Sequence, residues 1–485
     1  MEREAPSSEL LAARRRKLEE LRARGVEPFP HQFPGVEPIA SVRAAHEALE
    51  PGEESTAEHR VAGRLVARRG QGQMAFLDLA DRSGRLQLQA RVDELGPEGL
   101  QSLLALDLGD LIGVDGTAFR SRRGEPTLRV KGFTLLAKSL RPLPEKHHGL
   151  QDVETRFRHR ELDLVSNEEA RDLFVTRARV ISAARRYLDA EGFVEVETPV
   201  LQPLYGGAAA RPFTTHHNAL DRTLYLRIAT ELYLKRLIVG GLERVYELGK
   251  DFRNEGLDRA HNPEFTMLEF YEAYADYLDM ASRCEQLVAF AATEAGYTGA
   301  IDLSPPWRRQ TLREAILART GVDIARFGDR DSLAEEMRSK GIPPPKDDTW
   351  PQLVDELLSK HVEPDLIEPT FITDYPVEMS PFAKRHRSEP GLAERFEAFI
   401  GGMEIANAFT ELNDPDEQRR RFEEQRALAG LGDTEAHPYD EAFLAALEWG
   451  MPPTGGIGVG IDRLVMVLSG THSIREVILF PAMRD

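Results

Sequence analysis

Alternating hydrophobic and polar residues predict a series of short strands between residues 59 and 140. This period of two is typical of half-buried strands, because successive side chains point to opposite faces of the strand. A helix is expected near residues 97–106, between the third and fourth strands. Five short strands with one helix predict a small closed β-barrel. The predicted strands are residues 59–69, 75–79, 85–89, 111–116 and 128–133.

Two segments flank the predicted barrel. Residues 8–24 carry a sparse leucine stripe with basic residues on the other faces, and Gly25 follows, which together predict a helix. This helix is either a solvated amphipathic helix or a helix that flanks an RNA backbone. A proline-rich link follows it, and a second boundary lies at residues 141–144. The expected domains are an N-terminal helix and linker (1–58), the barrel (59–144) and a second domain (145–485).

The second domain is expected to open with a polar connector and a helix. Pro199 closes a predicted strand, because proline donates no ladder hydrogen bond and therefore sits at strand ends or edges. Residues 206–213, Gly-Gly-Ala-Ala-Ala-Arg-Pro-Phe, form a small-residue loop in which backbone can approach a ligand closely. The other predicted elements are the connector at 145–164, helices at 166–188 and 231–238, and strands at 224–227 and 245–252.

A hairpin at residues 251–271 gathers charged and aromatic side chains. Arg253 and Glu255 are two residues apart, so on an extended strand they point to the same face. Glu269 and Tyr271 share one side of the returning strand for the same reason. The hairpin therefore presents a cation, carboxylates, an imidazole and an aromatic ring to one surface. The alternative is a polar hairpin at a sheet edge with incidental charges.

The C-terminal part returns to strands after a helical region. Residues 276–345 are interpreted as a helical insertion. Predicted strands at 395–400 and 403–411 place Glu397 and Glu404 on neighbouring strands. The glycine-rich run after them leads directly into a helix, but the surrounding hairpins are antiparallel, which argues against a doubly wound dinucleotide fold. The predicted fold class is α+β, with a barrel and an antiparallel sheet flanked by helices.

Composition and charge limit the function classes. The single cysteine excludes an internal disulfide and fits a reducing, cytoplasmic compartment. No apolar run is long enough to predict a membrane span or a secretory signal. The net charge of −19 argues against general nucleic-acid affinity. Residues 60–142, however, hold 14 basic and 9 acidic residues, which leaves −24 on the rest of the chain. The predicted barrel therefore carries a local excess of positive charge on an otherwise acidic chain.

Phe76, Arg85 and Gln87 lie on adjacent strands of the predicted barrel. Barrels of the oligonucleotide-binding kind bind single-stranded bases by stacking on aromatic rings, with arginine and glutamine side chains supplying hydrogen bonds. The three residues are candidates for such a face. The alternative is that they are half-buried filler of the sheet.

Three segments occur in a diagnostic order: residues 192–199, Phe252–Glu255 with His261–Phe265, and Gly458–Arg463. They resemble the three motifs of the class II aminoacyl-tRNA synthetases. Within that class the chain is similar to the bacterial-type lysyl-tRNA synthetases, and the resemblance covers essentially its whole length. Residues 1–50 and 276–345 match only loosely. The blocks that carry the lysyl-type similarity are residues 206–213, 216–218, 231–235 and 407–414.

The resemblance implies ATP-dependent joining of L-lysine to adenylate, followed by transfer of lysine to the 3′ end of tRNA(Lys). Both reactants of the first step are anionic, so the site must supply positive charge and alignment. Arg253 would bind the α-phosphate and the lysine carboxylate, Arg463 and His261 would hold the distal phosphate, and both arginines would be catalytic. Phe265 would stack on adenine. The implied ATP-binding set is Arg253, Glu255, His261, Asn262, Phe265, Glu404 and Arg463, with Glu397 and Glu404 holding Mg²⁺.

The same resemblance implies a lysine pocket, an anticodon face and a homodimer formed through the first motif. Glu231 and Gly207 would bind the α-amino group, and Glu269, Tyr271 and Glu411 the ε-amino group. Asn407 would help with the carboxylate, and Phe409 would pack on the methylenes. On the barrel, Phe76 and Gln87 would contact the central uridine of the anticodon, with Arg85 between them.

Two other functions are weighed against this one. A relative that lysylates a protein instead of tRNA would resemble the catalytic part alone, so the barrel argues against it. A single-strand RNA-binding regulator with an inactive synthetase fold would have lost charged site residues. Arg253, Glu404 and Arg463 are all present, which argues against that reading as well.

Overall fold

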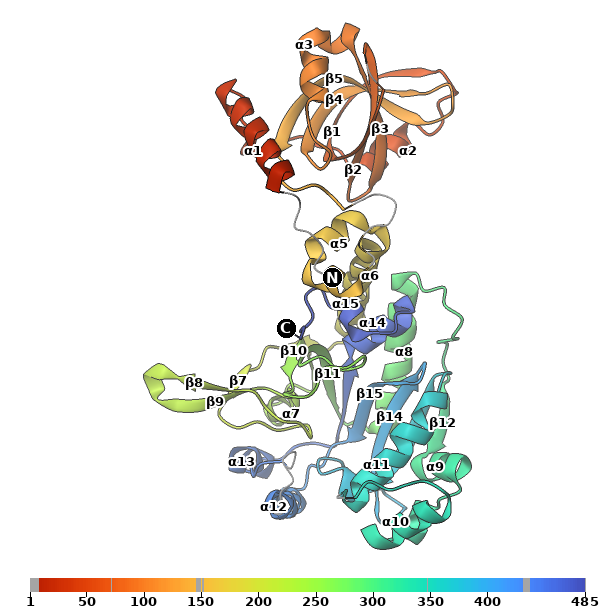
Figure 1. Cartoon of the computed structure of the whole chain (residues 1–485). Coiled ribbons are helices and arrows are strands. Elements are labelled where there is room, and N and C mark those ends of the chain that lie inside the picture. The colour runs from red at the N-terminus through yellow and green to blue at the C-terminus, as the bar shows by residue number, and fades with distance from the viewer. Residues whose placement is uncertain are drawn as a thin grey trace. The chain divides into compact units, whose positions relative to one another are not determined.

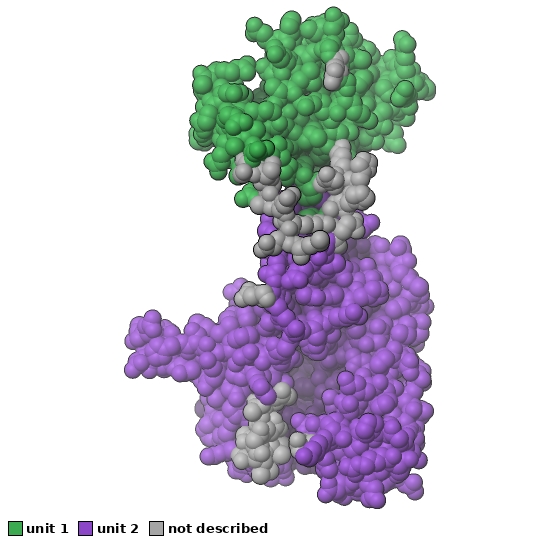
Figure 2. Space-filling view, in the orientation of Figure 1, with its two compact units in different colours: residues 1–150 green, residues 151–485 purple. Residues whose placement is uncertain are grey.

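The computed structural model describes residues 8–70, 72–144, 150, 152–346, 348–430 and 437–484. The chain divides into two compact units, residues 1–150 and residues 151–485, which Figure 2 shows in different colours. Each unit has its own hydrophobic core. In the described residues no helix has the length and apolar character that a membrane crossing needs.

The first unit is built on a closed barrel in the order β1-β2-β3-β5-β4. Alternate residues of the strands fill it: Leu77 and Leu79 of β2 and Leu88 of β3 are fully buried. The five predicted strands and the helix are therefore confirmed, although the first strand begins earlier than expected. Their bounds are β1 Glu54–Arg69, β2 Met74–Asp81, β3 Gly84–Arg91, α3 Val92–Leu104, β4 Leu111–Arg120 and β5 Pro126–Ala137.

The N-terminal helix α1 (Ser8–Ala23) packs on the same unit. Arg14 is buried and donates to the carbonyl oxygens of Leu108 and Ser139, at 3.1 Å each. Lys17 pairs with Asp107 at 2.6 Å. The shorter helix α2 (Ile39–Ala45) adds Ile39 and Val42 to the barrel core. Part of the basic face of α1 thus serves packing.

The second unit contains an eight-stranded sheet in the order β12-β13-β14-β15-β16-β11-β10-β6 (Figure 1). The strands from β13 to β10 pair antiparallel, and the outer pairs β12–β13 and β10–β6 are parallel. The α+β architecture is as predicted. The strand bounds are β6 Val194–Glu195, β10 Arg244–Phe252, β11 Glu264–Ala273, β12 Arg308–Thr311, β13 Thr370–Pro376, β14 Leu392–Ile400, β15 Met403–Thr410 and β16 Thr454–Gly460.

One face of this sheet is covered by helices. Leu268 and Phe270 of β11 and Val459 of β16 point into a core shared with α6, α8 and α14. Because side chains alternate along a strand, the residues between them point to the opposite face. That second face carries the candidate site. The covering helices are α6 Glu168–Ala190, α8 Tyr277–Ala295 and α14 Ile461–Ser469.

Smaller elements complete the second unit. A three-stranded sheet of order β7-β9-β8 precedes α7. The bounds are α4 Val153–Arg158, α5 Arg160–Ser166, β7 Leu201–Gln202, β8 Thr214–His217, β9 Arg222–Leu226, α7 Glu231–Val239, α9 Leu312–Thr320, α10 Arg330–Ser339, α11 Trp350–His361, α12 Pro415–Gly430, α13 Glu441–Glu448 and α15 Ile474–Val477.

Three expectations about the second unit need correction. The supposed connector, in its described part, forms α4 and α5, held by the buried ion pair of Arg160 with Asp163 at 2.5 Å. The region 276–345 is not one insertion, because α8 belongs to the main core and β12 is an edge strand of the main sheet. Only its later helices, with α11, form a separate hydrophobic cluster. Finally, Arg253 and Glu255 were expected on a strand of the hairpin, but β10 ends at Phe252 and both residues lie in the following loop.

Candidate functional site

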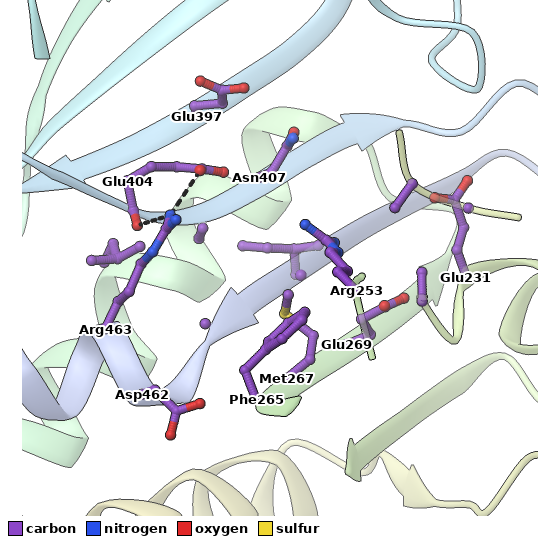
Figure 3. A pocket seen from close by; sticks show the side chains of 18 of the residues that line it. Glu231, Arg253, Phe265, Met267, Glu269, Glu397, Glu404, Asn407, Asp462 and Arg463 are labelled. Atoms are coloured by element: carbon purple, nitrogen blue, oxygen red, sulfur yellow. Dashed lines mark hydrogen bonds and ion pairs between the residues drawn. The ribbon is translucent and has the colours of Figure 1, made fainter. Parts of the chain in front are cut away.

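The open face of the large sheet holds a cavity of about 350 Å³ (Figure 3). Strands β11, β14, β15 and β16 form its floor, and the loop after β7 and the start of α7 form one wall. All the synthetase-type candidates of the second unit line this one cavity. They are Gly207, Glu231, Arg253, Glu255, His261, Asn262, Phe265, Glu269, Tyr271, Glu397, Glu404, Asn407, Phe409, Glu411 and Arg463.

Sheet register explains how distant segments meet here. On β16, Gly458 is paired with Glu269 of β11 on one side and with Asn407 of β15 on the other. Gly456 is likewise flanked by Tyr271 and Phe409. A strand of glycines thus runs between two strands of functional side chains, and the missing side chains leave the cavity open.

One end of the cavity is acidic. Glu231, Glu269 and Glu411 are buried, with exposures of 4%, 5% and 0%. Glu269 accepts from the backbone N–H of Thr230 at 3.0 Å and from the Tyr271 hydroxyl at 3.1 Å. Burial, with the nearby Asp251 carboxylate, raises the pKa of Glu269 to about 8. Burial also raises the pKa of Glu231 and of Glu411. This end is therefore built to receive positive charge.

The other end presents guanidinium groups. Arg463 donates to Glu404 Oε2 at 2.9 Å and lies 3.1 Å from Nε2 of His261. Arg253 lies over the ring of Phe265, 5.1 Å from its centroid. In the described part of the chain, Arg253 Nε donates to the carbonyl oxygen of Ile228 at 3.4 Å, and its guanidinium forms no ion pair with a carboxylate. In Figure 3, Arg253 lies between Glu231 and the Glu404–Arg463 pair. An anionic group between the two arginines would be held at both ends.

Glu397 and Glu404 face the cavity from neighbouring strands. Glu397 accepts from Tyr375 at 2.8 Å and from Arg395 at 2.7 Å. Burial raises the pKa of Glu397 to about 7, and Glu404 contributes to the rise while Arg395 opposes it. Hard carboxylate oxygens that repel one another suit a divalent cation. No group of three metal-ligating side chains occurs in the described residues, so such an ion would need further oxygens from a ligand.

Sequence reasoning missed Arg395, which lines the cavity. Its guanidinium donates to Glu397 at 2.7 Å, to Asn407 Oδ1 at 3.2 Å and to the carbonyl oxygen of Met379 at 2.6 Å. It therefore orients two candidate residues at once. A signal was present, because Arg395 and Glu397 are two apart on one strand and share a face.

Two predicted residues have local structural contacts as well. Asn262 accepts from the backbone N–H of Ala482 at 3.2 Å and donates to the carbonyl oxygen of Glu264, which ties down the loop before β11. Glu255 is exposed in the loop after β10. Both residues line the cavity.

The barrel candidates lie on its outer surface. Their neighbours Leu77, Leu86 and Leu88 are buried, so Phe76, Gln87 and Arg85 alternate outward. Phe76 and Gln87 are half-buried and Arg85 is exposed. Across the β2–β3 ladder, Phe76 faces Gln89, and Gln87 faces Asp78. The three candidates thus share one face of two adjacent strands.

Comparison with known proteins agrees with the division of the chain into a barrel unit and a second unit that holds the cavity. Residues 152–484 match the family described as tRNA synthetases class II (D, K and N), and residues 59–136 match an OB-fold nucleic acid binding domain. A lysine–tRNA ligase of Moorella thermoacetica is 53% identical over 484 residues, 98% of each chain. Another, of a Synechococcus species, is 51% identical over 98% of this chain and 99% of its own. A third, of Halalkalibacterium halodurans, is 48% identical over 100% of this chain and 98% of its own.

Proposed function

This chain belongs to the class II tRNA synthetases of the D, K and N group, and we infer from that membership that it is a lysine–tRNA ligase. It activates L-lysine with ATP and transfers the lysyl group to tRNA. The observation that carries the assignment is the cavity itself, which has buried glutamates at one end and two guanidinium groups at the other. An amino acid with two ammonium groups and one carboxylate is complementary to that arrangement.

The first step is attack of the lysine carboxylate on the α-phosphate of ATP, with release of pyrophosphate. Arg253 can bridge the carboxylate and the α-phosphate, because a planar guanidinium offers paired donors in fixed geometry. Arg463 and His261 would hold the distal phosphates, and Phe265 would stack on adenine. Catalysis then comes from alignment and from stabilisation of the charge that develops on the phosphate oxygens.

The lysine side chain extends toward the acidic end in this proposal. Glu231, beside the Gly207 loop, would receive the α-ammonium group. Glu269, Tyr271 and Glu411 would receive the ε-ammonium group, Asn407 would orient the carboxylate, and Phe409 would cover the methylenes. In support, Gly207 has φ +86°, and a Cβ there would lie 2.9 Å from Cβ of Glu231. Only glycine fits this close wall without strain.

Mg²⁺ is the proposed metal cofactor, held by Glu397 and Glu404 together with phosphate oxygens of ATP. When bound, it would neutralise phosphate charge. The repulsion between the Glu397 and Glu404 carboxylates, which contributes to the raised pKa of Glu397, supports a cation between them. Arg395 donates to Glu397 and Arg463 donates to Glu404, so each carboxylate is oriented by one guanidinium.

A homodimer and a cytoplasmic location are further parts of the proposal. Around the first motif, Val194, Val200 and Leu201 expose 50%, 41% and 48% of their surface, whereas Phe193 is buried in the core. Exposed aliphatic residues that cluster in one motif are typical of a covered interface. Sedimentation equilibrium of the purified chain tests the dimer.

Pyrophosphate exchange tests the activity directly. With ATP and each of the twenty amino acids in turn, lysine alone is expected to support fast exchange without tRNA. Exchange with another amino acid instead would refute the lysine assignment, and no exchange at all would favour an RNA-binding regulator. Charging of tRNA(Lys) then separates the synthetase from an enzyme that lysylates proteins.

Glu269→Gln is expected to weaken lysine binding about 10- to 100-fold, because a hydrogen bond to a charged group contributes about 1.5–3 kcal/mol. In the wild-type protein, lysine affinity should rise between pH 6 and pH 8. The Glu269 carboxyl, with a pKa of about 8, is protonated below that value and must release its proton to accept an ammonium group. The variant should lose this part of the pH dependence. Calorimetric titration with lysine measures both effects.

The control is Glu243→Gln, which changes an exposed carboxylate immediately before β10. It should bind lysine as the wild-type protein does. Full lysine affinity in Glu269→Gln would rule out this residue as part of the ε-ammonium site.

Phe76→Ala is expected to lower aminoacylation about 10- to 100-fold while leaving lysine-dependent pyrophosphate exchange unchanged. Stacking of one base on an aromatic side chain contributes about 1–3 kcal/mol, and Phe76 lies in a different compact unit from the cavity. Phe29→Ala, which removes a 43% exposed ring from the same unit, is the matched control. Equal losses in exchange and aminoacylation would contradict the proposed anticodon role.

A further inference from the structure

Lys235 lies on α7, one turn after Glu231, and is fully buried. Its ammonium group pairs with Glu231 Oε1 at 2.5 Å and also with Glu411 Oε2. Both glutamates line the cavity, whereas Lys235 does not occur among its described lining residues. The ammonium group therefore lies on the side of these glutamates that faces away from the cavity, behind the acidic wall formed by Glu231, Glu269 and Glu411. It connects Glu231 of α7 with Glu411, which directly follows β15.

Among the described residues, Lys235 has no solvent-exposed surface and lies among aromatic rings. Its Nζ lies 5.1 Å from the ring centroid of Phe382, 5.6 Å from that of Phe409 and 5.9 Å from that of Phe443. A buried ammonium group is costly unless it is paired, and these rings and the two carboxylates offset that cost. Burial opposes the charged form, but the two glutamates outweigh it and hold the pKa of Lys235 above its usual value.

Without this cation, the carboxylates of the acidic wall, which are Glu231, Glu269 and Glu411, would take up protons more readily. Glu231, Glu269 and Glu411 are all buried around one space, and like charges in such a place promote uptake of protons. Protonated carboxyl groups would no longer repel one another, but they would attract an ammonium group only weakly. With Lys235 present and all three carboxylates ionised, two net negative charges remain, which match the two ammonium groups of lysine.

The geometry points to Lys235 as a positioning residue for lysine recognition, whose ammonium group holds Glu231 and Glu411 from behind as anions directed at the cavity. This inference rests on the proposed function. Glu411 supports it, because its Oε2 forms an ion pair with Lys235 while neither of its carboxylate oxygens has a hydrogen-bond partner in the described residues. Its Oε1 is therefore available to a bound ammonium group.

Lys235→Met tests the inference, since methionine is similar in length and is compatible with the three aromatic rings. The KM for lysine in pyrophosphate exchange is expected to rise about 100-fold, as for loss of one partner of a buried charge pair. The KM for ATP should change less than about threefold, because its proposed contacts do not include Glu231 or Glu411. The acid limb of kcat/KM for lysine should move to higher pH, because the wall would bind a proton more tightly.

The pH profile involves groups from every element around the wall. Besides Glu231 and Glu411, these are Asp251 of β10, Glu269 and Tyr271 of β11, and Arg395 of β14. An unchanged KM for lysine in folded Lys235→Met would overturn the inference and leave a purely structural ion pair. Equal increases in the KM values for lysine and ATP would overturn it as well.

A second variant covers failure of Lys235→Met to fold. The double variant Lys235→Met with Glu411→Gln removes both charges of one pair, and it is compared with Glu411→Gln alone. If Lys235 acts through its carboxylate partners, its removal in the Glu411→Gln background should raise the KM for lysine by less than about tenfold. A further rise of about tenfold or more would overturn the inference. Wild-type exchange with lysine separates this outcome from failure of the proposed function.

Discussion

Gly456→Ala is expected to weaken lysine binding at least about 100-fold and to reduce lysine-dependent exchange in parallel. A Cβ atom at this position would lie 2.0 Å from Oε1 of Glu411 and 2.4 Å from Cε1 of Tyr271. Glu411 is fully buried and ion-paired with Lys235, and Tyr271 is 3% exposed, so relief of either contact requires a shift of a side chain that lines the acidic end. The methyl group would therefore displace the two groups proposed to bind the ε-ammonium, and a misplacement of about 1 Å can cost 100-fold in rate.

Gly458→Ala, on the same face of β16, is the matched comparison. Its added methyl group would lie 3.6 Å from Sδ of Met267 and 3.7 Å from Cγ of Glu269, which is ordinary contact. Calorimetry with lysine and thermal unfolding should be run on both variants. If both lose lysine affinity equally with unchanged melting temperatures, displacement of Glu411 and Tyr271 is not the cause.

Arg253→Gln is expected to lower kcat for pyrophosphate exchange about 100- to 1,000-fold, which is the usual effect of removing one donor that stabilises developing charge. Arg253 lines the cavity between its acidic and cationic ends, over the ring of Phe265 (Figure 3). Its guanidinium can therefore bind an anionic ligand in the cavity. Steady-state exchange at saturating ATP and lysine measures the effect.

Arg253→Lys separates charge from geometry. A lysine keeps the positive charge but not the planar fork that can bridge two anions. It should recover less than about a tenth of the wild-type kcat. Nearly full activity of this variant would show that a point charge is sufficient and would refute the bridging role of Arg253.

The acidic end of the cavity carries a cost in stability. Glu269 has a folded-state pKa of about 8, above its ordinary value of 4.5. Protonation of this carboxyl group therefore stabilises the folded state relative to the unfolded state. Its contribution to folding is fully present below about pH 4.5 and is lost as pH rises toward 8. Binding sites often keep such unfavourable charge because the ligand compensates it. Lysine should accordingly stabilise the protein most at the upper end of this range.

Much of the architecture could be predicted from local patterns. The strands of the barrel follow from alternation, since a period of two places Leu77 and Leu79 inside and Phe76 outside. The charged residues of the cavity were predicted through the resemblance of short segments of the chain to synthetase motifs. Those motifs are local, and residues such as Glu269 and Tyr271 share a face whatever the rest of the sheet does.

Other features were decided by the tertiary structure alone. That α8 belongs to the main core, and that β12 joins the sheet edge, depends on packing between segments far apart in the chain. Lys235 looks like an ordinary helix residue in sequence, and only the approach of α7 to the end of β15 places it between Glu231 and Glu411. The need for glycine at position 456 likewise arises from the register of three strands. Spacing along one element reveals which side chains share a face, but contacts across elements are set by register and packing, which no single segment encodes.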